Sequence, residues 1–183
     1  MQKNSAMTAL NDGESSPVAL RSQILVVIGV AGVGKTTLGQ ALASAVNARF
    51  LDADDFHPPP NVEKMRSGVA LTDADRDPWL TALNGELIAA NIRGSRIVLA
   101  CSALKQRYRD SISQGVSGIA WIFLDGDRNA IARRLRLRAN HYMPAVLLES
   151  QFEALERPLD AVSISIELST DEQVASVLFA LID

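Results

Sequence analysis

The sequence GVAGVGKT, residues 29–36, follows the apolar run ILVVIG, residues 24–29, and precedes the amphipathic segment LGQALASAVN, residues 38–47. It matches the phosphate-binding pattern G-x-x-x-x-G-K-[ST]. Its glycines let successive backbone N–H groups face a phosphate, and the helix that follows adds the positive end of its dipole. A glycine-rich turn with a chance lysine is the alternative, and the flanking strand and helix argue against it. The stretch therefore predicts a site for a nucleoside triphosphate.

Two side chains of this loop have predicted roles in binding ATP and Mg²⁺. Lys35 is expected to reach the β and γ phosphates, and the Thr36 hydroxyl is expected to ligate Mg²⁺. The predicted ATP-binding residues are Gly29, Val30, Ala31, Gly32, Val33, Gly34, Lys35, Thr36 and Thr37.

Apolar strands alternate with amphipathic helices from residue 21 onward. Strands are predicted at 24–29, 48–52, 96–101, 118–125 and 162–168, and helices at 38–47, 77–92, 104–112, 127–138, 144–156 and 170–182. Such alternation, with strands that are almost wholly apolar, predicts an α/β fold in which helices cover both faces of a parallel sheet. Residues 1–20 are rich in small and polar types and are predicted to be a flexible tail before one domain, 21–183.

Composition excludes several classes of protein. The chain has 183 residues, 48% of them hydrophobic, which suits one domain with one sizeable core. A net charge of -3 argues against a nucleic-acid partner. Cys101 is the single cysteine, so no internal disulfide can form. Without a secretory leader or an apolar run of about 18 residues, we expect no membrane partner and a cytoplasmic location.

Three aspartates follow the second predicted strand, in LDADDFHPPP, residues 51–60. Strand alternation would point Asp52 and Asp54 to one face and Asp55 to the other. Because ligands of parallel sheets bind beyond the carboxyl ends of the strands, Asp52 and Asp54 are expected to face the triphosphate. Asp52 is predicted to hold Mg²⁺, and Asp54 to orient the attacking hydroxyl and accept its proton. A turn or helix N-cap is the alternative, and it is strongest for Asp55.

Three longer blocks resemble the gluconokinases, a group of P-loop small-molecule kinases. They are DADDFHPPPNVEKMRSGVALTDADRDPWL (52–80), CSALKQRYRD (101–110) and RANHYMPAVLLESQFEALERP (138–158), and the resemblance extends over residues 23–182. It implies the P-loop kinase fold of shikimate and nucleoside monophosphate kinases, with a five-stranded parallel sheet and a mobile lid near 138–145. It also implies phosphate transfer from ATP to the 6-hydroxyl of D-gluconate, and a homodimer.

Several cations and polar residues of these blocks are candidates for the acceptor site. Arg76 is predicted to grip the gluconate carboxylate with two hydrogen bonds, against the alternative of a salt bridge to Asp73 or Asp75. Lysine is scarce, so Lys64 and Lys105 are candidate anion contacts, although both could be solvated helix residues. The predicted substrate-binding residues are Asp54, His57, Lys64, Arg76, Ser102, Lys105, Arg109 and His141.

Alternatives stay open for three of the residues in these blocks. His57 is either a donor to substrate hydroxyls or a turn residue. Trp79 is more suited to core packing than to a platform beside the substrate. Solvent competes with substrate for Arg109.

A basic stretch between residues 105 and 138 is placed by the resemblance near the lid. Arg134 and Arg138 are four residues apart on one helical face and are predicted to neutralise charge on the transferring phosphoryl group. A solvated basic face is the alternative. The predicted catalytic residues are Lys35, Asp54, Arg134 and Arg138. Two rival functions remain: a related kinase with another small acceptor, and a nucleotide-binding switch that engages a partner.

Overall fold

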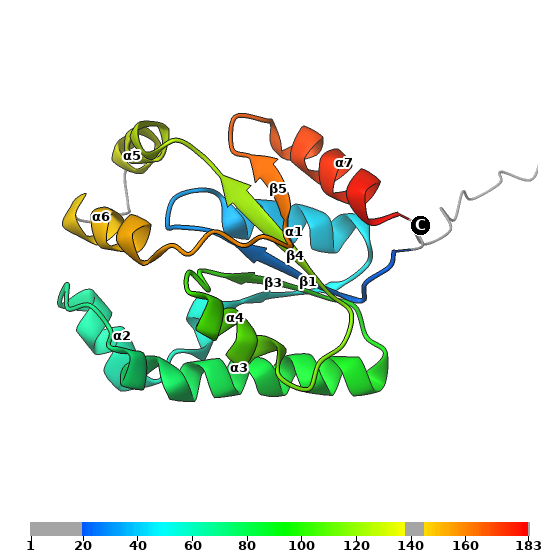
Figure 1. Cartoon of the computed structure of the whole chain (residues 1–183), viewed down its shortest axis with the longest axis horizontal. Coiled ribbons are helices and arrows are strands. Elements are labelled where there is room, and N and C mark those ends of the chain that lie inside the picture. Colours follow the sequence, from blue (N-terminus) through cyan, green and yellow to red (C-terminus); the bar gives the residue numbers. More distant parts are fainter. Residues whose placement is uncertain (1–19, 138–144, 183) are drawn as a thin grey trace, which may run out of the picture.

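A five-stranded parallel sheet forms the centre of the protein, with the strand order β2-β3-β1-β4-β5 (Figure 1). The computed structural model describes residues 20–137 and 145–182. The strands are β1 Ile24–Ile28, β2 Arg49–Asp52, β3 Ile97–Cys101, β4 Ile119–Asp125 and β5 Val162–Ser165. All neighbouring strands pair in parallel, and every residue of β1 and β3 is buried. The predicted α/β architecture with a parallel sheet is therefore confirmed.

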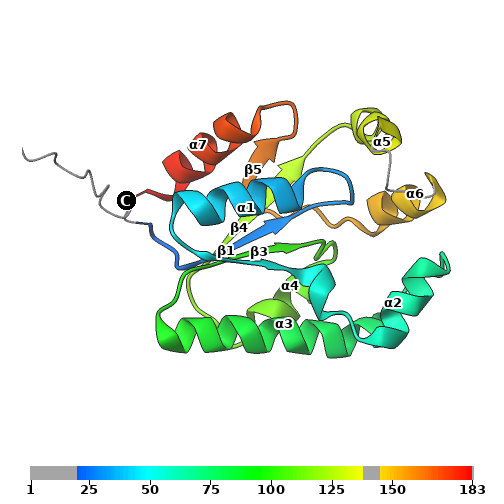
Figure 2. The ribbon, with the colours of Figure 1, turned by 180° about the vertical axis from the view of Figure 1, so that it is seen from behind.

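Helices cover both faces of the sheet (Figures 1 and 2). They are α1 Lys35–Ala45, η1 Ala53–Phe56 (a 3₁₀ turn), α2 Pro59–Arg66, α3 Asp73–Arg93, α4 Gln106–Ser113, α5 Arg128–Leu137, α6 Ala145–Ala154 and α7 Thr170–Leu181. Helices α1 and α7 lie on one face, and α3 and α4 lie on the other. In the described part of the chain, no helix combines the length and the apolar character needed to cross a membrane.

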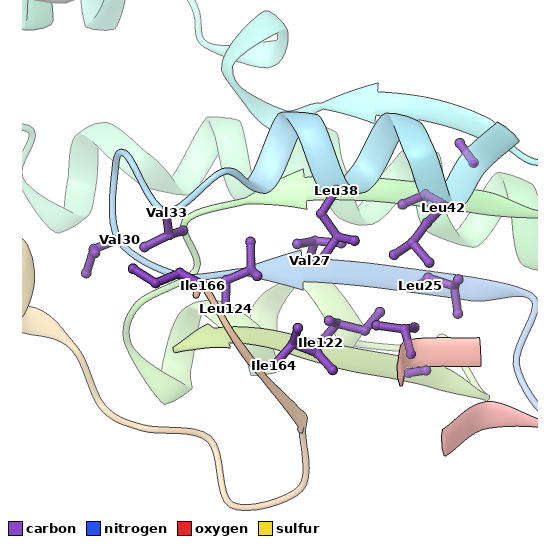
Figure 3. Packing of buried hydrophobic residues seen from close by; sticks show 14 of the residues in the cluster. Leu25, Val27, Val30, Val33, Leu38, Leu42, Ile122, Leu124, Ile164 and Ile166 are labelled. Carbon is purple, nitrogen blue, oxygen red and sulfur yellow. The ribbon is translucent and has the colours of Figure 1, made fainter. Parts of the chain in front are cut away.

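The alternation of β1 side chains divides the core into two clusters. Leu25 and Val27 pack with Leu38 and Leu42 of α1, as Figure 3 shows. Ile24, Val26 and Ile28 face the other side, where the partners are apolar residues of α3 and α4 such as Leu83, Leu87 and Ile112. Both faces of the sheet are therefore dry, and only its ends are available for polar chemistry.

The structure differs from the predicted elements between β2 and β3. Strand β2 ends at Asp52 and the chain turns at once into η1, so strand alternation does not apply to Asp54. Helix α2 occupies the proline-rich segment in which a turn was expected. Helix α3 begins at Asp73 instead of residue 77, because Thr72 and Asp75 form a reciprocal capping box.

Candidate active site

The phosphate loop, residues 29–34, joins β1 to α1 and rests on the apolar core. Val30 and Val33 are 3% and 2% exposed, and Figure 3 places them beside Leu124 and Ile166. Gly32 has a φ of +83°, and a Cβ there would lie 2.6 Å from the side chain of Leu135 in α5. Only glycine fits this left-handed and crowded position. Packing of the two valines on the core and of Leu135 against Gly32 therefore fixes the conformation of the loop.

Lys35 and Thr36, the first residues of α1, point their polar groups into the loop and toward β2. Lys35 Nζ donates to the Val30 carbonyl at 3.0 Å. Thr36 Oγ1 donates to Asp52 Oδ2 at 2.9 Å, while Asp52 Oδ1 accepts from the Asp54 N–H at 3.1 Å. The Asp52 carboxylate therefore caps η1 and touches Thr36 at the same time. A hydroxyl and a carboxylate, both hard oxygen donors, meet at the carboxyl edge of the sheet.

The carboxylate of Asp54 lies near this pair. Asp54 is exposed, and its side chain accepts no hydrogen bond from the described residues. Asp52, Asp54 and Lys35 all act electrostatically on Cys101, the last residue of β3. Burial is the main influence on that thiol and raises its pKa to about 12, so Cys101 is a neutral packing group.

His57 lies on the ring of Trp79, with ring centroids 4.6 Å apart and an interplanar angle of 8°. Trp79 is 2% exposed and donates from Nε1 to the Ala53 carbonyl at 2.7 Å, so its predicted core role is confirmed. Burial lowers the pKa of His57 below its ordinary value of 6.5; Asp54 opposes that shift and Arg76 adds to it. The imidazole is therefore neutral near pH 7. Its Nδ1 is buried and has no partner among the described residues.

Lys64 of α2 is tied to the start of α3. Its Nζ lies 2.6 Å from Asp75 Oδ1, and the other oxygen of Asp75 accepts from the backbone and hydroxyl of Thr72. Hydrogen bonding from Lys64 and then from Thr72 lowers the pKa of Asp75 to about 2. Lys64 is thus paired with Asp75 while its side chain stays 43% exposed, so its assignment as an anion contact remains a prediction.

Arg76 points toward the loop before α3. Its Nη1 donates to the carbonyls of Leu71 and Thr72. The guanidinium lies 5.6 Å from the centroid of the Tyr108 ring. Neither Asp73 nor Asp75 pairs with it, so the predicted alternative of a salt bridge is wrong. Nε and Nη2 of Arg76 have no hydrogen-bond partner in the described ranges.

A cationic cluster surrounds Tyr108. Lys105, Arg107 and Arg76 lie 5.6, 5.0 and 5.6 Å from its ring centroid. A single carboxylate oxygen, Asp73 Oδ1, pairs with Lys105 at 3.4 Å and also contacts Arg107 and the Tyr108 hydroxyl. Lys105 and Arg107 therefore share one acidic partner, and Arg76 lies on the same ring without pairing with it. We refer to Asp73, Arg76, Lys105, Arg107 and Tyr108 as the Tyr108 cluster.

Known proteins with this fold and these motifs are kinases. The shikimate kinase family model matches residues 31–177. The thermosensitive gluconokinase of Escherichia coli K12 is 38% identical over 158 residues, which cover 86% of this chain and 84% of that protein. The gluconokinase of Gluconobacter oxydans 621H is 43% identical over 143 residues, or 78% of this chain and 80% of that protein. This chain belongs to the gluconokinase family.

Solved structures agree with that membership. A gluconokinase from Sinorhizobium meliloti 1021 superposes with a TM-score of 0.77 at 38% identity, covering 85% of this chain and 89% of that one. The shikimate kinase of Aquifex aeolicus superposes with a TM-score of 0.52 at 15% identity, which shows the fold alone. As a member of the gluconokinase family, the chain is a P-loop kinase that uses ATP as its substrate.

Arg109, within a block that resembles gluconokinases, is not a surface residue as the solvent alternative supposed. It is 2% exposed. Nε and Nη2 donate to Gln106 Oε1, Nη1 donates to the carbonyls of Ala103 and Leu104, and Nη2 donates to the carbonyl of Glu156. A guanidinium has five N–H groups, and these bonds use all of them. In this structure Arg109 therefore joins two chain segments and leaves no donor for a substrate.

Ser102, Arg134, Arg138 and His141 are the remaining predicted site residues. Ser102 is half-buried directly after β3, and its hydroxyl bonds to none of the described residues. Arg134 donates from Nη2 to the Ile166 carbonyl at 2.5 Å, at the end of β5. Arg138, His141 and nearly all of the predicted lid lie outside the described residues, as does the predicted tail.

Sequence reasoning missed three members of the Tyr108 cluster. Arg107 and Tyr108 stand in the same block as Lys105, and Asp73 precedes Arg76 by three residues. The one available signal was the density of basic residues in KQRYR. Nothing in the sequence indicated that a carboxylate from α3 would gather them.

Proposed function

We propose that this protein transfers the γ-phosphoryl group of ATP to the 6-hydroxyl of D-gluconate, giving 6-phospho-D-gluconate. The observation that carries the proposal is that Asp52, which accepts a hydrogen bond from Thr36 at 2.9 Å, also caps η1, the turn that carries Asp54. One turn of chain brings a phosphate loop, a hard oxygen pair and an unengaged carboxylate to the same edge of the sheet. This arrangement suits phosphate transfer to an alcohol.

On the donor side, Lys35 is the residue that neutralises charge on the β and γ phosphates. Its present acceptor is a loop carbonyl, which a phosphate oxygen can replace with a stronger, charge-assisted bond. The Thr36 hydroxyl and the Asp52 carboxylate fit Mg²⁺, which takes few protein ligands and keeps waters and phosphate oxygens. When bound, Mg²⁺ supplies positive charge to the phosphates.

On the acceptor side, Asp54 orients the attacking hydroxyl and accepts its proton. Its side chain has no hydrogen-bond donor among the described residues, so it is available to a substrate alcohol. In a loose transition state positioning matters as much as proton removal. The Asp54→Asn variant should therefore bind gluconate and lose turnover.

The far end of an open-chain sugar acid carries a carboxylate, and the Tyr108 cluster suits that group. Lys105 and Arg107 share Asp73, and Arg76 beside them has no acidic partner among the described residues, which leaves an excess of positive charge. The charges of Asp54 and Arg76 both act on the pKa of His57, which lies between them in the sequence. We assign Arg76 and Lys105 to the carboxylate, and the neutral imidazole of His57 to the substrate hydroxyls between the two ends.

An ADP-release assay across candidate acceptors tests the proposal. We expect activity with D-gluconate, negligible activity with glucose, which lacks the carboxylate, and none with shikimate or a nucleoside monophosphate. Sites built on buried polar contacts can discriminate by about 10⁴ or more. Higher activity with shikimate or a nucleotide than with gluconate would show that gluconate is not the acceptor, while the kinase activity would stand. Nucleotide hydrolysis that no acceptor stimulates would favour a switch.

The remaining parts of the proposal concern the arrangement and setting of the protein. They are a flexible tail over residues 1–20, one kinase domain over 21–183, a lid near 138–145 with Arg134, Arg138 and His141 acting on phosphates and substrate, a homodimer, and a cytoplasmic location. Sedimentation velocity over a range of protein concentrations tests the dimer. A single species of monomer mass would remove it.

A further inference from the structure

One backbone N–H of the phosphate loop already has an oxygen acceptor. The Ala31 N–H donates to Oε1 of Gln151 at 2.6 Å, across 120 residues of sequence. Gln151 belongs to α6 and is partly exposed. The described residues offer no hydrogen-bond partner for its Nε2. The carboxamide oxygen of Gln151 thus contacts the loop, whereas its NH₂ group has no hydrogen-bond partner among the described residues.

Helix α6 has few other attachments to the donor side. Leu148 is buried, and Phe152 packs against the same apolar cluster as the loop valines. Arg128 of α5 pairs with Glu149 at 2.5 Å and lies 4.9 Å from the Phe152 ring centroid. The Ala31–Gln151 bond is a direct polar contact between α6 and the phosphate loop.

An oxygen 2.6 Å from a phosphate-loop N–H uses a backbone donor of the kind that such loops offer to phosphate. A backbone N–H has one hydrogen, so two acceptors cannot both bond to it well. Phosphate forms the stronger, charge-assisted hydrogen bond. We propose that Gln151 is a positioning residue that holds α6 against the phosphate loop until a phosphate oxygen of ATP replaces its Oε1 at Ala31. This inference rests on the proposed ATP site.

The opposite end of α6 leads to the acceptor side. Glu156, just beyond the helix, donates from its N–H to the Leu104 carbonyl at 2.9 Å, and its side chain accepts from the Gln106 N–H at 2.6 Å. The segment that contains those contacts also carries Lys105 and Tyr108. When its contact with Ala31 is lost, α6 remains attached beside the Tyr108 cluster through Glu156. We therefore expect nucleotide binding to affect the Tyr108 cluster.

Binding of a non-hydrolysable ATP analogue with Mg²⁺, measured by calorimetry, tests the competition. Gln151→Met keeps the side-chain length and removes the carboxamide acceptor, and Gln151→Ala removes both. Each should bind the analogue about 2- to 10-fold more tightly than the wild type, the factor that one net hydrogen bond represents. Glu153→Ala, an exposed position on the same helix, is the matched control and should leave the affinity unchanged.

Hydrogen exchange of residues 148–154 provides a second measurement that needs no variant. In the wild type, exchange should rise when the analogue binds; in Gln151→Met it should already be high and stay so. Tighter analogue binding by the variants should appear as a lower KM for ATP without a higher kcat. A purely structural role would instead lower the melting temperature and leave KM unchanged.

Three outcomes would overturn the inference. Weaker analogue binding by both Gln151 variants would mean that the carboxamide contacts bound nucleotide. Unchanged affinity, or unchanged exchange in the wild type, would mean that the contact has no role in nucleotide binding. A wild-type protein that binds no analogue would refute the ATP site itself, a result distinct from the other two.

Discussion

Thr36 and Asp52 are joined by a hydrogen bond of 2.9 Å, although one residue lies in the first turn of α1 and the other ends β2. The same carboxylate caps η1 through its second oxygen. The contact therefore fixes the distance between the phosphate loop and the segment that presents Asp54. The phosphate-loop side of the site and the side that carries Asp54 therefore meet at the Asp52 carboxylate.

Replacing Asp52 with asparagine should weaken the use of Mg²⁺. The variant keeps the side-chain shape and one oxygen but loses the charge, so we expect the Mg²⁺ concentration for half-maximal activity to rise about 10-fold or more. A Mg²⁺ titration of the initial rate measures this. Asp55→Asn is the control, since Asp55 is exposed in the same turn. Equal titrations for the two variants would remove Asp52 from the metal site.

Lys35→Ala should reduce kcat by about 10² or more with the fold intact. The loss follows from removing a preorganised positive charge that acts on the transferring phosphoryl group. Initial rates at saturating ATP and gluconate give kcat, and circular dichroism checks folding. Turnover at the wild-type level in a folded variant would contradict the assignment of Lys35.

Arg76→Ala should raise the KM for gluconate about 10-fold or more and change the KM for ATP much less. Two hydrogen bonds to a carboxylate are lost, and charge-assisted bonds of this kind are among the strong ones. Arg93→Ala provides the control, because Arg93 is an exposed arginine at the other end of the same helix. If both variants behave alike, Arg76 does not bind the carboxylate.

His57 should make stability and gluconate binding depend on pH. Its pKa in the folded protein lies below the ordinary value of 6.5, chiefly because of burial. The unfolded chain therefore takes up the proton first as pH falls. The stability contributed by a neutral His57 is complete above pH 6.5 and declines as pH falls through the lowered pKa.

Thermal unfolding and the KM for gluconate, measured between about pH 5 and 8, test this dependence. His57→Gln cannot titrate and should flatten both profiles in this range. Profiles that keep the wild-type shape in the variant would assign the titration to another group.

Arg109→Lys should destabilise the protein by about 2 kcal/mol or more and leave the KM for gluconate unchanged in the folded fraction. Lysine keeps the charge but cannot reproduce the planar fork, so buried carbonyls lose their donors. Denaturant unfolding measures the free energy. Arg133→Lys, at an exposed position of α5, should have little effect. A large rise in KM with unchanged stability would return Arg109 to the substrate site.

The sequence was informative where a residue's environment depends on its near neighbours. Apolar strands and amphipathic helices led to the sheet, and the phosphate loop and the end of β2 led to the meeting of Thr36 with Asp52. The prediction that α3 starts at residue 77 was wrong, because the capping box of Thr72 and Asp75 is the stronger local signal.

Contacts between distant segments could not be predicted in this way. Arg109 was predicted to bind substrate, with solvent as the alternative, yet its five N–H groups are satisfied by residues of two segments. Asp73 gathers cations from the segment after β3. Gln151 reaches a loop 120 residues away. Periodicity reports which face a side chain occupies, but not which partner it meets there.

The strands β2 and β3 lie side by side in the sheet, and the chain between them carries Asp54, His57, Lys64 and Arg76. On the proposed assignment of these residues to the acceptor, we expect mutations confined to this one stretch to alter the choice of acceptor while the central strand and the phosphate loop keep their sequence. In evolutionary terms, selection on this segment would change acceptor specificity separately from nucleotide binding. An engineer seeking a kinase for another sugar acid would diversify this stretch first, together with residues 105–108.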